Sequence, residues 1–269
     1  MLDTAFHIAA GAGVGLAIGL TGVGGGSLMT PLLLLFGYPL HVAIGTDLLY
    51  AAITKAGGMA AHGRRGNVDW RIVRRLALGS IPASLLTVLA LHTVFGDAQA
   101  YAPLLTTALG VMLVLTAGAI ALRPAGSSQE TDAAHAADAQ PSEALPARAT
   151  SGRAGITVAV GVLLGICVTL SSVGAGAFGA AVLLMLYPAL RSVRVVGSDV
   201  AHAVPLTLVA GLGHLALGNV DFALLAALIV GSLPAIWFGA RLAERVPDGI
   251  LRPALAALLA LLGVRFALF

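Results

Sequence analysis

The sequence predicts an all-α protein that crosses a membrane several times. Its 269 residues are 58% hydrophobic and only 10% charged, with a mean hydropathy of +0.97. Soluble domains carry about 25% charged residues, so this chain has too few charges to cover a surface that faces water. Cys167 is the sole cysteine, which excludes a disulfide within the chain. Long apolar runs separated by short loops that contain arginine complete the pattern.

The apolar segments fall into two sets of five. The first set covers about 5–20, 26–37, 41–62, 72–93 and 101–122, and the second about 154–170, 176–188, 195–215, 222–241 and 250–268. Residues 124–153 between them are rich in Ala, Ser and Pro and lack apolar periodicity, which is typical of an aqueous linker. We therefore expect a first membrane repeat at 1–123, a linker at 124–153 and a second membrane repeat at 154–269.

Short motifs recur in the same order in both sets. Three of them share one offset of 152 residues (45 to 197, 66 to 218 and 79 to 231): Gly45-Thr46-Asp47 with Gly197-Ser198-Asp199, Gly66-Asn67-Val68-Asp69 with Gly218-Asn219-Val220-Asp221, and Gly79-Ser80-Ile81-Pro82 with Gly231-Ser232-Leu233-Pro234. A glycine-rich stretch at 20–26 similarly corresponds to 170–176. Such ordered repetition indicates an internal duplication. The Asn-Val-Asp triplets precede apolar runs and predict a turn followed by a helix N-cap.

The arginines predict that the second copy is inverted relative to the first. The loop around 62–75 is densely basic, whereas its counterpart around 214–221 contains neither Lys nor Arg. Of the 15 basic residues, all but Lys55 and Arg265 fall on one side if the copies are inverted; five of these would change sides if the copies were parallel. The positive-inside rule therefore favours two inverted repeats, with the basic loops and the linker in the cytoplasm.

Inversion requires each copy to cross the membrane an odd number of times. Residues 5–20 would span about 24 Å as a helix and residues 26–37 only about 18 Å, whereas the hydrocarbon core is about 30 Å thick. We therefore expect the first two helices of each repeat to be short and to form a hairpin broken by glycine, which returns to the side it left. Three longer spans complete each copy.

The glycine-rich hairpin tips are the candidate binding site. A non-helical turn at membrane depth survives only where protein or a water-filled cavity surrounds it. Glycine exposes backbone N–H groups, the following helix directs its positive end at the turn, and nearby hydroxyls add donors, which together suit a small oxyanion. The alternative is close helix packing. The candidate residues are Thr21, Gly24, Gly25, Gly26 and Ser27 in the first tip, and Ser171, Ser172, Gly174 and Gly176 in the second.

These motifs resemble the TauE/SafE family of sulfite exporters. The resemblance rests on Gly22-Val23-Gly24-Gly25-Gly26, Pro31 and Gly45-Thr46-Asp47, on their repetition in the second half, and covers the chain apart from the linker. It implies a carrier in the bacterial inner membrane for sulfite or related organosulfur anions. The second copy departs from the pattern, because Ser172, Ala175 and Ala181 replace Gly22, Gly25 and Pro31.

Four ionisable residues lie in or beside the apolar spans. Lys55 is the only lysine, and burying it costs at least about 3 kcal/mol, so we expect it either to meet a substrate anion, Asp47 or Asp199, or to extend to the membrane surface. Asp47 and Asp199 follow hydroxyl residues; we favour a structural role as helix caps over proton coupling. His202 is a weaker candidate for a proton relay.

The sequence thus predicts a secondary transporter of a small anion that works by alternating access at a midplane site between the repeats. Export is favoured over uptake, because the membrane potential drives anions outward. The alternatives are an anion channel of the same architecture and a membrane subunit that does not transport. We expect no enzymatic activity, cofactor, metal or nucleic acid. The expected partners are the small anionic substrate and the lipid bilayer, with a homodimer left open.

Overall fold

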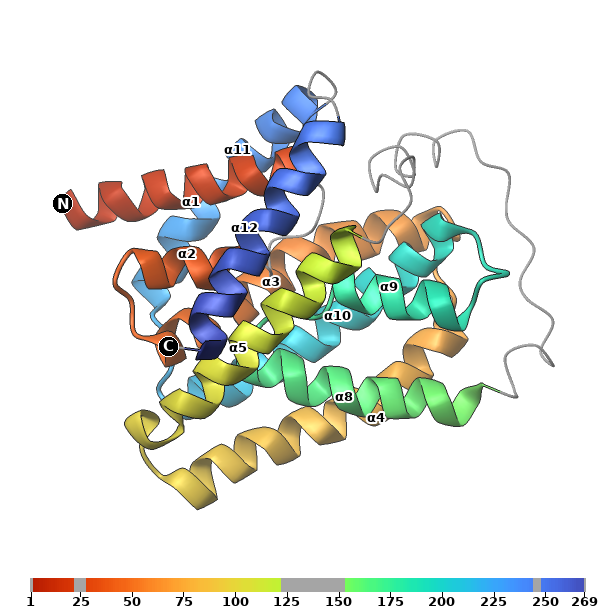
Figure 1. Cartoon of the computed structure of the whole chain (residues 1–269), viewed down its shortest axis with the longest axis horizontal. Helices are drawn as coiled ribbons and strands as arrows, with labels where there is room; N and C mark the ends of the chain where they lie inside the picture. The colour runs from red at the N-terminus through yellow and green to blue at the C-terminus, as the bar shows by residue number, and fades with distance from the viewer. Residues whose placement is uncertain (1, 22–27, 122–152, 244–247, 269) are drawn as a thin grey trace.

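A computed structural model describes residues 2–21, 28–121, 153–243 and 248–268, which form helices and no strands (Figure 1). The first set of helices comprises α1 (Leu2–Thr21), α2 (Met29–Leu35), α3 (Leu40–Arg64), α4 (Trp70–Ala90), its π-helical extension η2 (Leu91–Phe95) and α5 (Ala98–Ala121). The second set comprises α8 (Ala154–Ser171), α9 (Ala177–Leu186), α10 (Ser192–Ala216), α11 (Phe222–Ala243) and α12 (Asp248–Leu268). Each apolar segment expected from the sequence contains a helix, and the predicted all-α class is confirmed.

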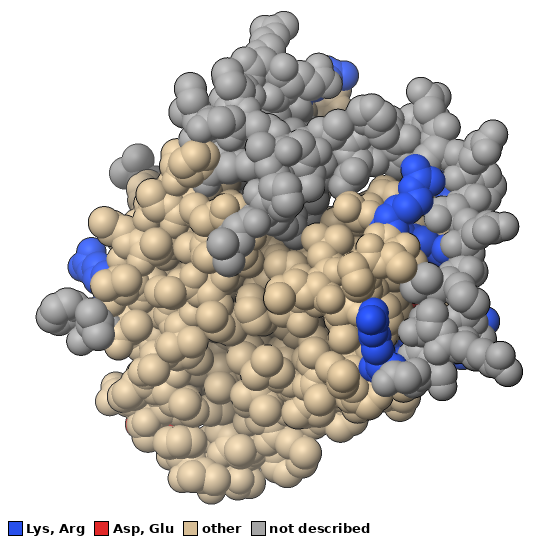
Figure 2. All heavy atoms as spheres, turned by 45° about the vertical axis from the view of Figure 1, so that its right-hand side comes forward, with Lys and Arg blue, Asp and Glu red and all other residues tan. Residues whose placement is uncertain are grey.

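The outer surface of the described residues is apolar, as a lipid-facing surface requires. Five of the described segments are long and apolar enough to cross a membrane, namely Trp70–Phe95, Ala98–Ala121, Ala154–Ser171, Ser192–Ala216 and Phe222–Gly239. Large apolar side chains on the helices are exposed, among them Leu78 and Leu261, each at 68%. Figure 2 shows a broad surface without charge, with Lys and Arg gathered mainly toward its right-hand edge. In a bilayer this surface contacts lipid tails rather than water.

Only the second helix of each expected hairpin is short. α2 has 7 residues and α9 has 10, which is too short to cross a hydrocarbon core. α1 has 20 residues and α8 has 18, so both reach about 27–30 Å, which corrects the expectation that the first helix of each hairpin is short. In α1 the difference arises because the helix already begins at Leu2, three residues before the apolar segment expected from the sequence.

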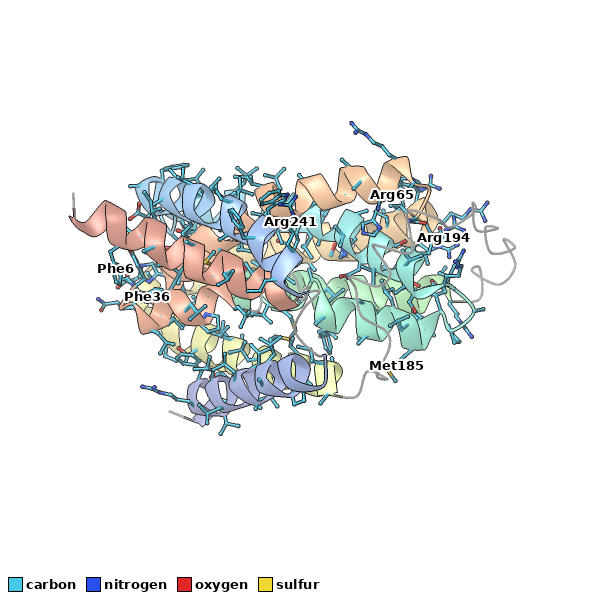
Figure 3. The ribbon with its side chains drawn as sticks, turned by 90° about the horizontal axis from the view of Figure 1, so that it is seen from above. Phe6, Phe36, Arg65, Met185, Arg194 and Arg241 are labelled. Carbon is cyan, nitrogen blue, oxygen red and sulfur yellow. The ribbon has the colours of Figure 1, made fainter. Side chains whose placement is uncertain are left out.

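Each hairpin returns to the end of the molecule where it began. The rings of Phe6 in α1 and Phe36 after α2 lie 5.3 Å apart in an edge-to-face contact, visible in Figure 3. His7 also bonds the hydroxyl of Tyr38. In the second copy, the hydroxyl of Thr157 near the start of α8 bonds that of Tyr187 after α9 at 2.5 Å. The chain therefore enters α3 and α10 from the ends at which α1 and α8 started.

The two copies exchange helices rather than packing as separate bundles. α1 of the first copy packs against α11 of the second, and α8 of the second packs against α4 of the first. Matching glycines allow the close approach: a Cβ on Gly231 would collide with the carbonyl oxygen of Ile8, and one on Gly79 with that of Val158. α3 and α10 pack against each other between these pairs. Small residues at such contacts bring membrane helices within van der Waals range.

Two matching loop contacts hold α3 and α10 in antiparallel orientation. The loop after α3 donates the N–H of Asp69 to Ser198 Oγ at 2.8 Å, near the start of α10. The loop after α10 donates the N–H of Asp221 to Thr46 Oγ1 at 3.2 Å, near the start of α3. Because the end of each helix lies beside the start of the other, α3 and α10 run in opposite directions.

The aspartates of these loops cap the helices that follow, as predicted. Asp69 Oδ1 accepts the N–H of Arg71 at 3.0 Å, and Asp221 Oδ1 accepts the N–H groups of Ala223 at 2.9 Å and Leu224 at 3.0 Å. The first contact also brings arginines of both copies together, since Arg65 directly follows α3 and Arg194 lies one turn before Ser198. Figure 3 shows Arg65 and Arg194 at the same end of the molecule.

Candidate functional site

The turn between α8 and α9 lies between the two central helices. Its backbone passes through left-handed conformations at Ser172 (φ 58°), Gly174 (φ 129°) and Gly176 (φ 139°), which reverse the chain within a few residues. On one side, α3 brings Lys55 to the carbonyl oxygen of Ala175. On the other side lies α10. We call these residues, together with the acidic groups described below, the central site.

The two serines of this turn have different surroundings. Ser171 Oγ donates to the carbonyl oxygen of Cys167 at 2.6 Å and accepts the N–H of Val173 at 3.1 Å, so it holds the shape of the turn. Ser172 is only 2% exposed, and its Oγ has no hydrogen-bond partner within the described residues. The hydroxyl of Ser172 therefore does not hold the shape of the turn, and it lies beside the carboxyl group of Asp47.

Lys55 lies inside the protein instead of extending to the membrane surface. Its side chain is partly buried, and Nζ donates to the carbonyl oxygen of Ala175 at 2.7 Å, across 120 positions of the chain. Asp199 and Asp47 both lie within its coulombic range, and Asp199 is the stronger partner. The position 152 residues later holds Thr207, whose hydroxyl bonds its own helix at the carbonyl oxygen of Ala203. The cation of the central site thus comes from one copy only.

Neither candidate aspartate caps a helix, which corrects the structural role favoured from the sequence. α3 begins at Leu40 and α10 at Ser192, so Asp47 and Asp199 both lie in the second turn or beyond. The hydroxyl residue before each aspartate misled the interpretation, because Thr46 and Ser198 accept N–H groups from the loops of the other copy. Asp47 is 0% exposed and Asp199 is 1% exposed. Both are buried carboxyl groups inside central helices.

The surroundings of the two carboxyl groups correspond but are not identical. Asp47 Oδ2 accepts the hydroxyl of Thr30, in α2, at 2.6 Å, while Oδ1 has no hydrogen-bond partner among the described residues. Ser172 lies beside this carboxyl group. Asp199 lies against the first turn of α9, where a Cβ on Gly179 would collide with its Oδ1. Each carboxyl group therefore faces the short helix of its own copy.

His202 completes the polar part of the central site. It is fully buried in α10, its Nε2 bonds Ser80 Oγ of α4 at 2.8 Å, and it lies within coulombic range of Lys55. The sequence interpretation missed Thr30 and Ser80. Ser80 belongs to the repeated Gly-Ser-x-Pro motif, whose repetition was a usable signal; Thr30, in the short α2, had none.

The structure brings together most of the predicted site residues it describes. Lys55, Asp47, Asp199 and His202 lie around the second tip, which supplies Ser171, Ser172, Gly174 and Gly176. Gly24, Gly25, Gly26 and Ser27 of the first tip lie outside the described residues, as does the side chain of Thr21.

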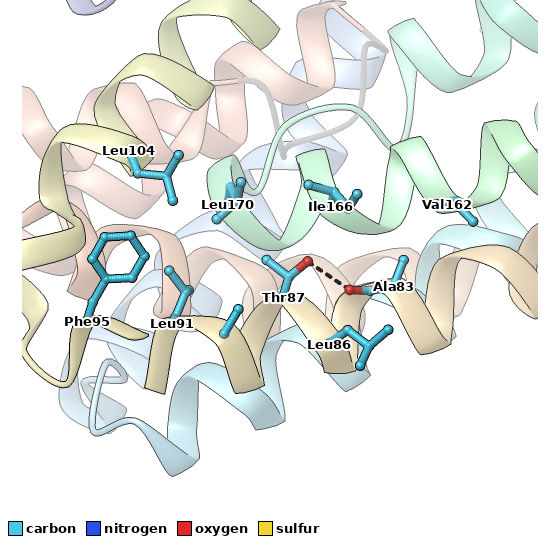
Figure 4. A pocket seen from close by; sticks show the side chains of 10 residues that line it. Ala83, Leu86, Thr87, Leu91, Phe95, Leu104, Val162, Ile166 and Leu170 are labelled. Carbon is cyan, nitrogen blue, oxygen red and sulfur yellow. Dashed lines mark hydrogen bonds between the residues drawn. The ribbon is translucent and has the colours of Figure 1, made fainter. Parts of the chain in front are cut away.

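An apolar pocket between α4, α5 and α8 is a poor candidate for an anion site. It has a volume of about 310 Å³ and is lined by residues of α4, η2, α5 and α8, including Leu86, Phe95 and Ile166 (Figure 4). The hydroxyl that it contains, on Thr87, already donates to the carbonyl oxygen of Ala83 at 2.7 Å. The pocket offers no free polar group and no charge, so a charged ligand would lose its hydration there without compensation.

Comparison with known proteins agrees with a transport role for this architecture. The profile of the family described as "Sulfite exporter TauE/SafE" matches residues 7–266. "Probable membrane transporter protein YjnA" of Bacillus subtilis (strain 168) is 34% identical over 254 residues, covering 94% of this chain and 95% of the relative. "Probable membrane transporter protein YdhB" of the same organism is 28% identical over 269 residues, covering 92% and 96%. No solved structure gives a significant match.

The helical fold, its apolar surface and these relatives define the class of protein: the chain is a membrane transporter with several membrane-spanning helices. More particularly, it belongs to the TauE/SafE sulfite exporter family.

Proposed function

We propose that the protein is a secondary carrier that exports a small anion, sulfite or an organosulfonate, through the central site. One observation carries the proposal: the only lysine of the chain lies inside the protein and donates to a glycine-containing turn between two central helices. A buried ammonium group marks a ligand path by default. The description of the family supports a sulfur oxyanion as the cargo.

Alternating access between two inverted repeats is the mechanism we propose. The antiparallel order of α3 and α10, the matching loop contacts and the exchange of α1 and α8 between the copies support this arrangement. In an inverted pair, exchanging the conformations of the two copies converts an outward-open site into an inward-open one. We further propose that the end carrying Arg65 and Arg194 faces the cytoplasm of a bacterial inner membrane, following the positive-inside rule.

Counterflow in proteoliposomes tests this function. Vesicles containing purified protein and a high internal concentration of unlabelled sulfite should accumulate radiolabelled sulfite transiently above the external level. A channel equilibrates the label without this overshoot, and a subunit without transport activity gives no uptake.

Thermal unfolding with sulfite, sulfate, thiosulfate, taurine, acetate and chloride identifies the anion, because a ligand that binds the native state raises Tm. Absence of both overshoot and a Tm shift would contradict the proposal.

Replacement of the two serines should separate structure from ligand binding. Ser171→Ala leaves the buried N–H of Val173 without its acceptor, so we expect a loss of about 1–3 kcal/mol in stability. Ser172→Gly removes the hydroxyl beside Asp47 but suits the positive φ, so Tm should change little while sulfite transport falls about tenfold or more. Thermal unfolding and counterflow of both variants check this pair. Normal transport by Ser172→Gly would remove this hydroxyl from the proposed site.

A further inference from the structure

The central site contains more negative than positive charge. Of the charged groups near it, α3 contributes Asp47 and Lys55, and α10 contributes Asp199. The other titratable groups that the described residues place here are His202 of α10 and Tyr50 of α3, which lies within coulombic range of Asp47. The described parts of α2, α4 and the α8–α9 turn add the hydroxyls of Thr30, Ser80 and Ser172 and the carbonyl of Ala175.

With both carboxyl groups ionised, the site has a net charge of one negative unit before any ligand arrives. This inference rests on the proposed function. A carrier for anions must reduce this negative charge when it binds its cargo, because repulsion between like charges is strong in a site from which water is largely excluded. Lys55 lies within coulombic range of both carboxyl groups, and its single charge balances only one of them. The geometry around Asp47 identifies the carboxyl group that can take a proton.

The geometry around Asp47 provides a place for a proton. Its Oδ2 is occupied by the hydroxyl of Thr30 at 2.6 Å. Its Oδ1 is buried without a hydrogen-bond partner in the described part of the chain, and so is the neighbouring Ser172 Oγ. A proton on Oδ1 would turn this unpaired acceptor into a donor, able to bond either Ser172 Oγ or an anion oxygen beside it.

We infer that the central site binds its anion together with a proton on Asp47, so that the protein is a proton–anion symporter. The proton comes from the water on the side from which the anion enters, resides on Asp47 Oδ1 during the conformational change, and leaves to the water on the other side. For a cargo with one negative charge, such as hydrogen sulfite or a monosulfonate, one negative and one positive charge then cross together, and the site has the same net charge when loaded as when empty. The membrane potential therefore does not drive the cycle. Export proceeds when the outward gradient of the anion exceeds the opposing inward gradient of protons.

Transport of sulfite under a controlled membrane potential tests this inference. Proteoliposomes with valinomycin and a potassium gradient impose a potential of either sign, and a pH gradient is imposed separately with the potential held at zero. In mildly acidic buffer, where hydrogen sulfite is the main species, we expect a pH gradient alone to drive sulfite accumulation by the unaltered protein. The potential should change the initial rate by less than about twofold. For Asp47→Asn, which keeps an acceptor for Thr30 but cannot release a proton, we expect the effect of the pH gradient to disappear. Whatever flux remains should depend on the potential.

Asp97→Asn is the matched control, because Asp97 is an exposed carboxylate in the loop between η2 and α5. It should respond to the pH gradient and to the membrane potential as the unaltered protein does.

If sulfite flux through the unaltered protein depends on the membrane potential and not on the pH gradient, the inference is overturned but the proposed carrier function is not. A lack of sulfite counterflow in the unaltered protein would overturn both. The decisive measurement is made on the unaltered protein, so it stands even if Asp47→Asn fails to fold.

Discussion

Lys55→Met is expected to reduce sulfite transport at least about a hundredfold while leaving the helical fold intact. Methionine retains most of the length of the side chain, so the packing between α3 and the α8–α9 turn changes little. What disappears is the only lysine charge and its bond to the carbonyl oxygen of Ala175. Without that charge the two nearby carboxyl groups have no cation to balance them, and an anion would have to enter a site of two negative units. Counterflow measures the loss, and thermal unfolding verifies the fold.

Chemical restoration distinguishes the charge of Lys55 from its shape. In a Cys167→Ser background, Lys55→Cys should be inactive, and 2-aminoethyl methanethiosulfonate should restore part of the transport by rebuilding an ammonium group of similar length. The uncharged reagent methyl methanethiosulfonate should restore none. Thr207→Val alters the position equivalent to Lys55 in the second copy, where the hydroxyl bonds only its own helix, and should stay close to full activity. Substantial sulfite transport by Lys55→Met would exclude the ammonium group from the binding step.

The sequence predicted the helices well because apolar length and turn residues are local properties. All of the expected segments contain helices, and the Asn-Val-Asp triplets form the turns and N-caps that their side chains favour. The start of α1 was placed a few residues late, because polar residues such as Asp3 interrupt an apolar run without ending a helix. Local signals therefore specify helix existence more reliably than helix ends.

The central site was only partly predictable because its contacts join distant segments. The sequence identified Lys55 as a residue that needs a partner, yet the partner is the backbone of Ala175, which has no distinctive side chain. Asp47 and Asp199 were expected to cap helices, since a hydroxyl residue followed by aspartate is typical of a helix start. The structure places both aspartates inside helices, because α3 and α10 each begin seven residues before them. The hydroxyls of Thr46 and Ser198 serve loops of the other copy, a role that no local pattern encodes.

Gly45→Ala and Gly197→Ala are each expected to destabilise the protein by about 2–3 kcal/mol, and to a similar extent. A Cβ on Gly45 would collide with the carbonyl oxygen of Asn219, and one on Gly197 with that of Asn67. Both neighbours are backbone atoms of loops anchored by hydrogen bonds to Thr46 and Ser198, so they cannot rotate away as a flexible side chain would. For a chain of this size, the loss corresponds to a fall in Tm of about 4–12 °C. Thermal unfolding in detergent measures it.

Gly57→Ala is the control, because Gly57 lies in α3 as Gly45 does but has no heavy atom within 4 Å of an added Cβ. There alanine should leave Tm unchanged or raise it, since alanine favours a helix over glycine by up to about 1 kcal/mol. Equal behaviour of Gly45→Ala and Gly57→Ala would contradict the close approach of the loop to α3. If Gly45→Ala lowers Tm and Gly197→Ala does not, only one of the two loop contacts fixes the central helices. The equivalence of the two ends, which the repeated Gly-hydroxyl-Asp motif suggests, would then be lost.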